Sequence, residues 1–249
     1  MQALCIDPMA QPLKSYRPKY EPPDAVNQTL FSEFLAAIGR DIPQAQKGLF
    51  PRAEQRDPPL FWAGDLSVLK SPAICVIGAR KVSEAGRKRA RRIARVLVDA
   101  GVSVVSGLAR GIDTAAHESA LENGGRTAAV IGTPIDRCYP AENAHLQETI
   151  WREQLLVSQF PTGHRTYPSD FPKRNRLMAA VTDGSIIVEA SDSSGSLHQA
   201  AECVRLGRWL FIMRSVVEDP SLTWPQKFLG NDRVVVLSDP EDVLARVAA

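Results

Sequence analysis

The chain has 249 residues, is 44% hydrophobic and carries a formal net charge of only +2, so it suits one large α/β domain and its overall charge identifies no partner. Its four cysteines, Cys5, Cys75, Cys138 and Cys203, form no CxxC pair, which argues against a zinc site or a disulfide framework and favours a reducing cytoplasm. The amino terminus lacks the layout of a signal peptide, and no apolar run approaches the roughly 18 residues that span a membrane.

The first 57 residues predict an N-terminal extension. Residues 9–25 are polar and rich in proline, a composition typical of poor order. Residues 28–40 place apolar side chains at helical spacing, so we expect one helix there. An irregular connection over residues 51–72 follows, with apolar side chains that pack onto the main body. The chain is therefore divided into an extension, residues 1–57, and a main domain, residues 58–249.

From residue 73 onward, short apolar runs alternate with helical patterns. The expected strands are residues 73–78, 102–107, 127–132, 155–160, 184–190, 208–213 and 233–238. The expected helices are residues 83–101, 112–125, 141–154, 172–183, 195–207 and 240–248, with a short one at 225–230. Strands that are apolar almost throughout, alternating with helices, predict an α/β fold with a mainly parallel sheet and helices on both faces.

The turns after the strands are the candidate site, because ligands of such sheets bind beyond the carboxyl ends of the strands. Several of these turns combine glycine with arginine. Glycine lets the backbone approach a ligand, a following helix N-terminus favours an anion, and arginine matches phosphate. In "SGLARGID" we expect Arg110 to face an anion while Gly107 and Gly111 allow close approach. The alternative is that Arg110 only caps the turn.

Two nucleotide-binding motifs are absent from the sequence. The turn "IGARKVSEAG" lacks the GxGxxG pattern, and no GxxxxGK[ST] occurs, so an ordinary NAD site and a P-loop NTPase are both disfavoured. We therefore expect no cofactor.

The segment "FPKRNR" combines an aromatic ring with charge. Phe171 can stack a base, Lys173, Arg174 and Arg176 are basic, and Asn175 can hydrogen-bond a base edge or a phosphate. This is the chemistry of sequence-tolerant single-strand binding. The alternative is a helix N-terminus with Phe171 as a hydrophobic staple, which explains the three cations poorly because they oppose the helix dipole.

Residues 80–95 hold eight basic side chains against one acidic residue, Glu84. Two interpretations stay open for this run. It forms a surface that tracks phosphates and releases counterions, or it is the solvated face of a helix, as charge runs usually are.

Other polar residues have weaker patterns. Asp113 and His117 stand four apart on a helix and can pair as acid and base, but Asp113 as a helix cap and a packed His117 are favoured. Glu189 at a strand end is a candidate ribose contact, or a turn-stabilising acceptor. "SDSSGS" is a candidate phosphate nest, or a flexible turn. The remaining histidines, His145, His164 and His198, show no metal-ligand spacing, so no metal site is expected.

Six segments occur in the order seen in the DprA/Smf family: "AICVIGARK", "VVSGLARGIDTAAH", "AAVIGTPIDRCYPAEN", "LLVSQFPTG", "FPKRNRLMAAV" and "SIIVEASDSSGSL". The chain resembles this family over about residues 58–235. The resemblance implies a Rossmann-like core, related to lysine-decarboxylase-like nucleotide-binding proteins. It also implies a cytoplasmic, non-catalytic protein of DNA processing, recombination and transformation that binds single-stranded DNA, forms a homodimer and passes strands to a RecA-type recombinase.

The residues and the resemblance together predict the binding site. The expected DNA or phosphate contacts are Arg80, Ser106, Gly107, Arg110, Gly111, Phe171, Lys173, Arg174, Asn175, Arg176, Gly195 and Ser196. The resemblance establishes no catalytic residue.

The sequence departs from the family pattern in two places. His198 and Gln199 stand where the family often has isoleucine and threonine, and the chain ends at Ala249, so we expect a short member without a C-terminal winged-helix domain. Two alternatives remain for such a member. It is an antitoxin that neutralises a cognate toxin in phage defence, or a sensor or enzyme that binds a nucleotide in the same pocket.

Overall fold

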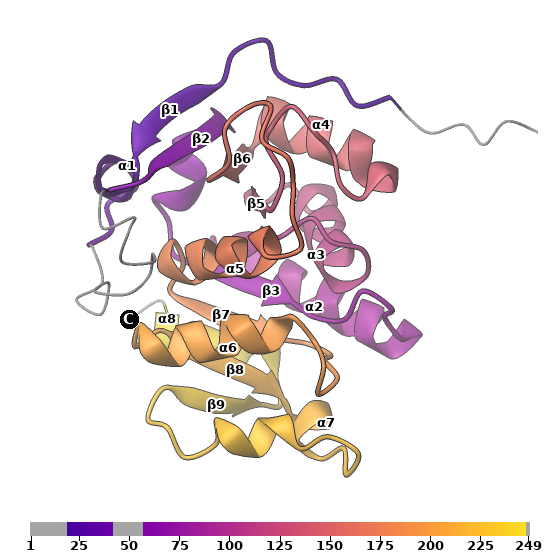
Figure 1. Cartoon of the computed structure of the whole chain (residues 1–249). Coiled ribbons are helices and arrows are strands. Elements are labelled where there is room, and N and C mark those ends of the chain that lie inside the picture. Colours follow the sequence, from indigo (N-terminus) through magenta and orange to yellow (C-terminus); the bar gives the residue numbers. More distant parts are fainter. Residues whose placement is uncertain (1–18, 42–56, 248–249) are drawn as a thin grey trace, which may run out of the picture.

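The computed structural model describes residues 19–41 and 57–247. Within these ranges, one sheet has the strand order β1-β2-β6-β5-β4-β3-β7-β8-β9 (Figure 1). The strands are β1 Asn27–Leu30, β2 Pro59–Gly64, β3 Ala73–Ile77, β4 Ser103–Ser106, β5 Thr127–Ile131, β6 Leu155–Ser158, β7 Gly184–Ile187, β8 Trp209–Met213 and β9 Val234–Leu237. The helices are α1 Phe31–Ala37, α2 Glu84–Asp99, α3 Ile112–Glu122, α4 Ala144–Glu153, α5 Asp170–Ala180, α6 Ser196–Arg205, α7 Arg214–Val217 and α8 Leu244–Val247.

The strands from β6 to β9 in this order are all parallel, while β1 and β2 extend the β6 edge in antiparallel pairing. Helices α2, α3 and α4 cover one face of the sheet, and α5 and α6 cover the other (Figure 1). The predicted fold class, a mainly parallel α/β sheet with helices on both faces, is confirmed. After β3 the chain adds β4, β5 and β6 on one side of β3, and then β7, β8 and β9 on its other side. The carboxyl ends of β3 and β7 therefore form a topological switch point, where ligands of open α/β sheets bind.

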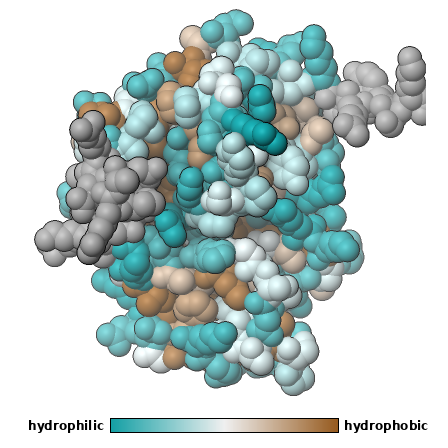
Figure 2. Space-filling model, viewed as in Figure 1, coloured by the Kyte–Doolittle hydropathy of each residue, from teal (hydrophilic) through white to brown (hydrophobic). Residues whose placement is uncertain are grey.

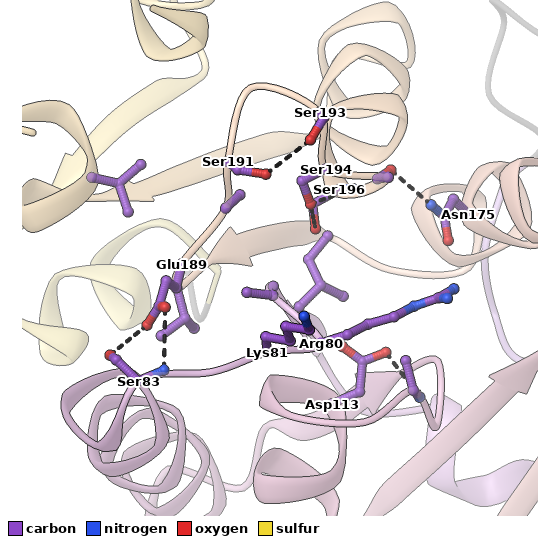
Figure 3. Close-up of a pocket in the computed structure, with 18 of the residues that line it drawn as sticks. Arg80, Lys81, Ser83, Asp113, Asn175, Glu189, Ser191, Ser193, Ser194 and Ser196 are labelled. Atoms are coloured by element: carbon purple, nitrogen blue, oxygen red, sulfur yellow. Dashed lines mark hydrogen bonds between the residues drawn. The ribbon is translucent and has the colours of Figure 1, made fainter. Parts of the chain in front are cut away.

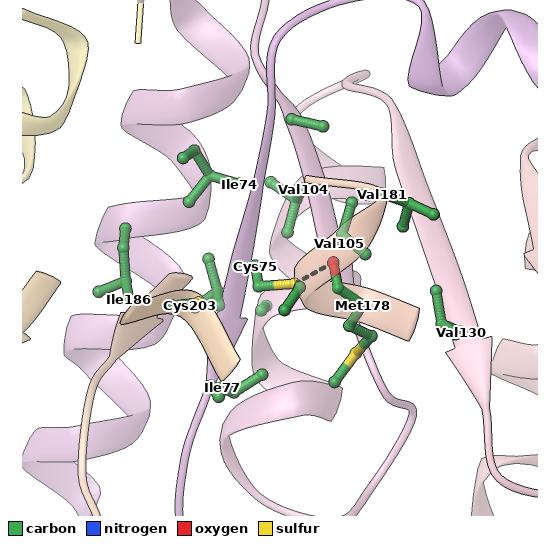
Figure 4. Packing of buried hydrophobic residues seen from close by; sticks show 14 of the residues in the cluster. Ile74, Cys75, Ile77, Val104, Val105, Val130, Met178, Val181, Ile186 and Cys203 are labelled. Carbon is green, nitrogen blue, oxygen red and sulfur yellow. Dashed lines mark hydrogen bonds between the residues drawn. The ribbon is translucent and has the colours of Figure 1, made fainter. Parts of the chain in front are cut away.

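The central strand β3 is buried along its whole length, because parallel strands of such a sheet are covered on both faces. On one side, Cys75 lies 3.9 Å from the carbonyl oxygen of Met178 in α5 (Figure 4). On the other side, α2 buries Ile93 and Leu97. The Ser83 hydroxyl caps α2 by accepting a hydrogen bond from the Gly86 N–H at 2.9 Å, so the helix begins at a fixed place beside the end of β3.

The N-terminal part of the prediction is wrong in two places. The expected helix over residues 28–40 begins with a strand, β1, and the connection expected to be irregular contains β2. The two strands pair with each other, and β2 pairs with β6. Phe34 of α1 belongs to the same hydrophobic core as β3, and the division of the chain at residue 57 stays a prediction. The stretch predicted to be poorly ordered lies largely outside the described residues.

The C-terminal part differs in detail. The expected short helix at 225–230 is a 3-10 turn, Trp224–Lys227, and the last expected helix consists of a 3-10 turn followed by α8. The helix α7 is not predicted by the sequence. In the segment after β8, the apolar residues Val216 and Trp224 are 4% and 0% exposed and belong to the core of this chain. The homodimer itself stays a prediction.

Figure 2 shows a largely hydrophilic surface over α5, with hydrophobic side chains gathered over the part of the face that holds α6. None of the helices in the described ranges combines the length and the apolar character needed to cross a bilayer.

Candidate nucleic-acid interface

A cavity of about 960 Å³ lies at the switch point between β3 and β7. Its lining comes mainly from the β3–α2 turn (residues 78–83), the start of α5 (171–178), the β7–α6 turn (188–196) and the segment after β8 (215–222). We call this cavity the switch-point pocket. Figure 3 shows the turn with Arg80 and Lys81 and the turn with Ser191 and Ser193 as separate walls of the pocket.

One wall of the switch-point pocket is positively charged. Arg80 and Lys81 follow β3 and are exposed, and Arg89 reaches the pocket from α2. The Arg80 guanidinium carbon lies 5.5 Å from the centre of the Phe171 ring. In the part of the chain that the structure describes, none of these three cations has a hydrogen-bonded or ion-paired acidic partner. They are therefore free to bind an anion, and we call them the open cations.

The opposite wall presents hydroxyl groups from the "SDSSGS" turn. The Ser194 hydroxyl donates to the Ser196 hydroxyl at 3.1 Å and accepts from the Ser196 N–H at 3.2 Å. The Asn175 side chain of α5 donates to the Gly195 carbonyl at 3.1 Å. The turn is thus fixed to α5, and its hydroxyls can donate to or accept from a ligand.

The acidic residue of this turn is directed away from the pocket. Asp192 accepts hydrogen bonds from the backbone N–H of Trp224 at 2.8 Å and from Thr223 at 3.1 Å. Nearby hydrogen bonds, above all from Trp224, hold the pKa of Asp192 below its usual value. The carboxylate therefore anchors the loop before β9 and does not line the wall that an anion would meet.

Glu189 is a carboxylate that does line the pocket. It accepts hydrogen bonds from the Ser83 hydroxyl at 2.7 Å and the Ser83 N–H at 3.2 Å. A negative charge at this helix start also interacts favourably with the dipole of α2. These contacts support the interpretation of Glu189 as a turn-stabilising acceptor, while contact with a ribose stays a prediction.

At the base of the pocket, whose lining includes both residues, Arg174 and Asp113 are buried charged side chains, 5% and 4% exposed. Arg174 donates to the carbonyl oxygens of Gly107 and, at 2.9 Å, Val130. Asp113 accepts from the N–H groups of Gly107 at 3.1 Å and Ala109 at 3.3 Å. Burial raises the pKa of the Asp113 carboxyl and lowers the pKa of Arg174, while each charge opposes the shift of the other.

Arg174 is part of the pocket lining. Its guanidinium donates to the carbonyl of Gly107, the residue after β4, and to the carbonyl of Val130 in β5, because α5 packs across the ends of these strands. Arg174 is therefore buried and tied to the backbone at the base of the pocket, and its contact with phosphate stays a prediction. For Asp113, the sequence favoured the role of a helix cap over that of an acid. The structure supports this role in part, because Asp113 accepts hydrogen bonds from N–H groups of the turn before α3.

The glycines of "SGLARGID" leave space for the protein itself. A Cβ atom at Gly107 would lie 1.7 Å from Nη1 of Arg174. Gly111 has φ +82°, and a Cβ there would lie 2.3 Å from the Ala79 carbonyl oxygen. Ser106 is fully buried and donates to the Val76 carbonyl at 2.7 Å. The close approach predicted at these glycines is real, but the group that approaches is a neighbouring turn or side chain instead of a ligand.

Arg110 lies outside the pocket lining. It is exposed and pairs with Glu142, with an Nη2–Oε2 distance of 2.9 Å. Hydrogen bonding to Glu142 raises the pKa of Arg110 further above its usual value. Arg110 thus forms an exposed ion pair with Glu142 that links two turns. A contact between Arg110 and phosphate stays a prediction, and it requires this ion pair to break.

The segment "FPKRNR" is not a loop, because α5 begins at Asp170. Phe171 and Asn175 line the pocket. Lys173 points to Asp170, at 3.3 Å, and Lys173 and Arg176 both lie outside the lining. The structure therefore brings six of the predicted residues together in the pocket lining, Arg80, Phe171, Arg174, Asn175, Gly195 and Ser196, and places the other predicted residues outside this lining.

The basic run of α2 divides into two parts. Lys88, Arg91 and Arg92 face acidic residues: Lys88 lies 3.6 Å from Glu84, Arg91 pairs with Glu122, and Arg92 lies 2.7 Å from Asp239. We call this part the α2 outer face. The interpretation as a solvated, ion-paired face holds for the outer face, whereas Arg89 joins the pocket.

The histidines have structural surroundings. His117 is buried, with Nδ1 2.7 Å from the Thr127 hydroxyl, and burial lowers its pKa to about 3. It is therefore neutral near pH 7, and Asp113 takes other partners, so the pair has no acid–base geometry. His164 stacks on Phe160 at 4.8 Å. No cluster of three metal-binding side chains occurs within residues 19–41 and 57–247, and the absence of a metal stays a prediction.

Several pocket residues are absent from the predicted contacts, although two sequence patterns contained them. Lys81 and Arg89 belong to the basic run 80–95, and Ser191, Ser193 and Ser194 belong to the "SDSSGS" turn. The turn "GARK" directly after β3 is a signal for Lys81, because this turn lies at the switch point. The departure at Gln199 does not disturb the serine turn, since this side chain is buried and hydrogen-bonded to the Ser185 hydroxyl at 3.0 Å.

A family model described as DNA recombination-mediator protein A matches residues 38–248 of the chain. The DNA processing protein DprA of Streptococcus pneumoniae is 39% identical over 186 residues, which are 75% of this chain and 65% of that protein. The chain thus spans slightly less than two thirds of the length of this curated relative.

Two solved structures have a similar fold. The X-ray structure of DprA from Streptococcus pneumoniae aligns with a TM-score of 0.70 and 34% identity over 87% of this chain and 78% of that chain. DNA processing protein A from Helicobacter pylori aligns with a TM-score of 0.71 and 23% identity over 90% and 95%. The latter structure is described as giving insight into the single-stranded DNA binding mode of that protein, and at this identity its likeness concerns the fold alone.

Proposed function

Because the chain belongs to the DNA recombination-mediator protein A family, as the resemblance to DprA/Smf predicted, we propose that it binds single-stranded DNA in the switch-point pocket and acts in DNA processing during recombination. The observation that carries this proposal is the group of open cations, Arg80, Lys81 and Arg89, beside the Phe171 ring. Cations neutralise phosphates, and an aromatic ring stacks a base that is not held in a duplex.

The shape of the pocket supports a single strand over a duplex. Arg80 lies over Phe171, and both line the cavity of about 960 Å³ together with the serine turn. A base reaches such a ring only when it is unstacked and unpaired, and unpairing a duplex costs free energy. Single-stranded DNA offers its bases without this cost.

We propose a binding role without catalysis. Three carboxylates of the described ranges line the pocket. Asp113 is buried against backbone N–H groups, Glu189 accepts from Ser83 at the start of α2, and Asp219 accepts from the N–H and hydroxyl of Ser221. Among the described residues, none of the three has a hydrogen bond or ion pair to a histidine or a second acid that would make it a general acid or base. The proposal includes a cytoplasmic location, as for other proteins that act on DNA.

Fluorescence anisotropy tests the proposal. A labelled oligothymidylate of about 20 nucleotides and a duplex of equal length are titrated with the protein at one stated salt concentration. We expect tighter binding of the single strand. Equal or tighter binding of the duplex contradicts the proposal.

The partners named by the sequence prediction remain separate proposals. A homodimer and a RecA-type recombinase follow from the family resemblance, whereas no observation favours a toxin or a bound nucleotide. Light scattering at micromolar concentration tests the dimer, and a mass of 27.2 kDa, that of one chain, contradicts it.

A further inference from the structure

We propose that Tyr139 and Tyr167 continue the binding track beyond the switch-point pocket by stacking bases of the same DNA strand. This inference rests on the proposed function, and it gives the strand a direction: from the pocket across the ends of β5 and β6, away from β8 and β9. It adds two contacts that no motif of the sequence indicated.

The first observation is exposure. The exposed large hydrophobic side chains of the described ranges are Leu30, Tyr139 and Tyr167, with 42%, 53% and 49% of their surface exposed. Leu30 lies on the edge strand β1. Both tyrosines lie in turns after parallel strands, Tyr139 after β5 and Tyr167 after β6, and therefore at the same edge of the sheet as the pocket.

The second observation is a row of contacts that leads out of the pocket. The ring of Tyr139 lies 5.6 Å from the ring of Phe171, with an interplanar angle of 48°. The guanidinium carbon of Arg80 in turn lies 5.5 Å from the centre of the Phe171 ring. A Cβ atom at Gly132 would lie 2.7 Å from Phe171, so the glycine at the end of β5 makes room for this row.

The turn that carries Tyr139 is held in place. The Arg137 carbonyl accepts hydrogen bonds from Thr133 at 3.2 Å and Gln147 at 3.1 Å. Asn143 donates to the Leu108 carbonyl at 2.9 Å. Binding costs less conformational entropy when the loop that makes the contact is already ordered. The Tyr139 ring is therefore preorganised for stacking.

Tyr167 is fixed in a similar way. Its N–H donates to the buried carboxylate of Asp170 at 2.9 Å. Its ring meets His164 edge-on at 5.9 Å, and His164 stacks on Phe160. Arg165 lies 5.8 Å from the Tyr167 ring. The ring thus has a rigid neighbour and a cation beside it, and about half of its surface is open.

The surroundings of the tyrosines favour a nucleic acid over a protein partner. Tyrosine and arginine also occur in protein interfaces, but there they accompany a contiguous apolar core, and the described residues hold only Leu30, Tyr139 and Tyr167 as exposed large apolar side chains. Here each tyrosine stands next to cations, Arg165 beside Tyr167 and Arg80 one ring away from Tyr139. Rings that alternate with cations are the chemistry of sequence-tolerant single-strand binding.

Abasic DNA separates stacking from charge. Wild-type protein is titrated with an oligothymidylate of about 20 nucleotides and with an abasic oligonucleotide of the same length, which keeps the phosphates and lacks the bases. The variants are Tyr139→Ala, Tyr167→Ala and the double variant. The matched controls are Tyr139→Phe and Tyr167→Phe, which keep the rings, and Leu30→Ala, which removes an exposed apolar side chain elsewhere.

We expect each alanine variant to bind oligothymidylate roughly five- to 150-fold more weakly, the loss of about one stacked base, with an unchanged dependence on salt. Affinity for the abasic strand should stay within about twofold, as should the affinity of the control variants for oligothymidylate. Circular dichroism and melting curves check that each variant is folded.

The outcomes distinguish the inference from the proposed function. If wild-type protein binds oligothymidylate and the alanine variants bind it equally well, the stacking role is wrong and the pocket proposal stands. If the variants lose the same factor on both strands, the tyrosines act through the fold or through phosphates, which also overturns the inference. If wild-type protein binds no single strand, the proposed function fails. If the variants change only the mass seen by light scattering, the tyrosines serve a protein interface.

Discussion

The switch-point pocket and the α2 outer face are both rich in arginine and lysine, and only the pocket leaves its cations without partners. On the outer face, Arg91 and Arg92 meet Glu122 and Asp239. In the pocket, Arg80 and Lys81 have no acidic partner among the described residues. Exposed ion pairs contribute little to stability, but they occupy the groups that would otherwise bind a phosphate.

The comparison teaches that a basic run in a sequence is not in itself a binding surface. Whether a cation can bind a phosphate depends on whether the fold places an acidic side chain next to it. Asp239 comes from the segment after β9 and pairs with Arg92 of α2, whereas Glu189, an acid that lines the pocket, accepts hydrogen bonds from Ser83. Arg174 shows a third situation, a buried cation that donates hydrogen bonds to backbone carbonyl groups. Experiments can break or sharpen each part of this comparison.

Arg174→Ala should have the largest effect. Removing its guanidinium leaves the buried carbonyl groups of Gly107 and Val130 without a donor, which costs about 1–3 kcal/mol of unfolding free energy for each group. Urea unfolding measures this loss. Arg80→Ala is the matched control, and because Arg80 is exposed it should change stability by about 0.5 kcal/mol or less. A near-neutral Arg174→Ala would contradict the structural role.

Arg80→Gln and Lys81→Gln should weaken binding of single-stranded DNA. A hydrogen bond to a charged group contributes about 1.5–3 kcal/mol, so each variant should lose roughly 10- to 150-fold in affinity. The slope of log affinity against log salt should become shallower by roughly 0.7 for each lost contact. Anisotropy titrations at several salt concentrations give both quantities.

The α2 outer face provides the control for this prediction. Arg91→Gln and Arg92→Gln remove as much charge from the sequence, but from residues that already face acids. We expect their affinity to change by less than about twofold. If the outer-face variants lose as much affinity as the pocket variants, the distinction between the two regions is wrong.

His117 predicts a smaller, pH-dependent effect on stability. Burial lowers its pKa to about 3, so between about pH 6.5 and 3 the unfolded chain binds a proton that the folded chain does not. The contribution is therefore fully present above about pH 6.5 and is lost as the pH falls, by up to about 1.4 kcal/mol per pH unit. Unfolding of His117→Gln should show a shallower decline over this range. His145→Gln, at an exposed position, should decline as the wild type does.

The parallel sheet could be predicted because each of its central strands is covered on both faces. This makes runs such as 73–78 apolar throughout, a pattern that is visible locally. The strands β1 and β2 could not be predicted in the same way. The edge strand β1 is largely exposed, and β2 beside it is half-buried. β2 also begins with Pro59, a residue found in strands mainly at the first position or on an edge. Its partner, β6, lies far along the chain.

The candidate site could be predicted in outline. Arg80 and Phe171 follow from the turns at the ends of strands and from the aromatic–basic segment, and both line the pocket. The burial of Arg174 could not be foreseen, because its side chain type is the same as that of Arg176, two residues later. Only the fold decides that Arg174 is buried and donates to the carbonyls of Gly107 and Val130 while Arg176 does not.

The most direct test of the central claim locates the DNA on the protein. Wild-type protein is bound to single-stranded DNA that contains 5-bromodeoxyuridine, irradiated, digested and analysed by mass spectrometry. The account predicts cross-links to Phe171 and to the turns at residues 78–83 and 191–196, which line the switch-point pocket. Cross-links confined to the α2 outer face, or to the opposite edge of the sheet, would contradict it.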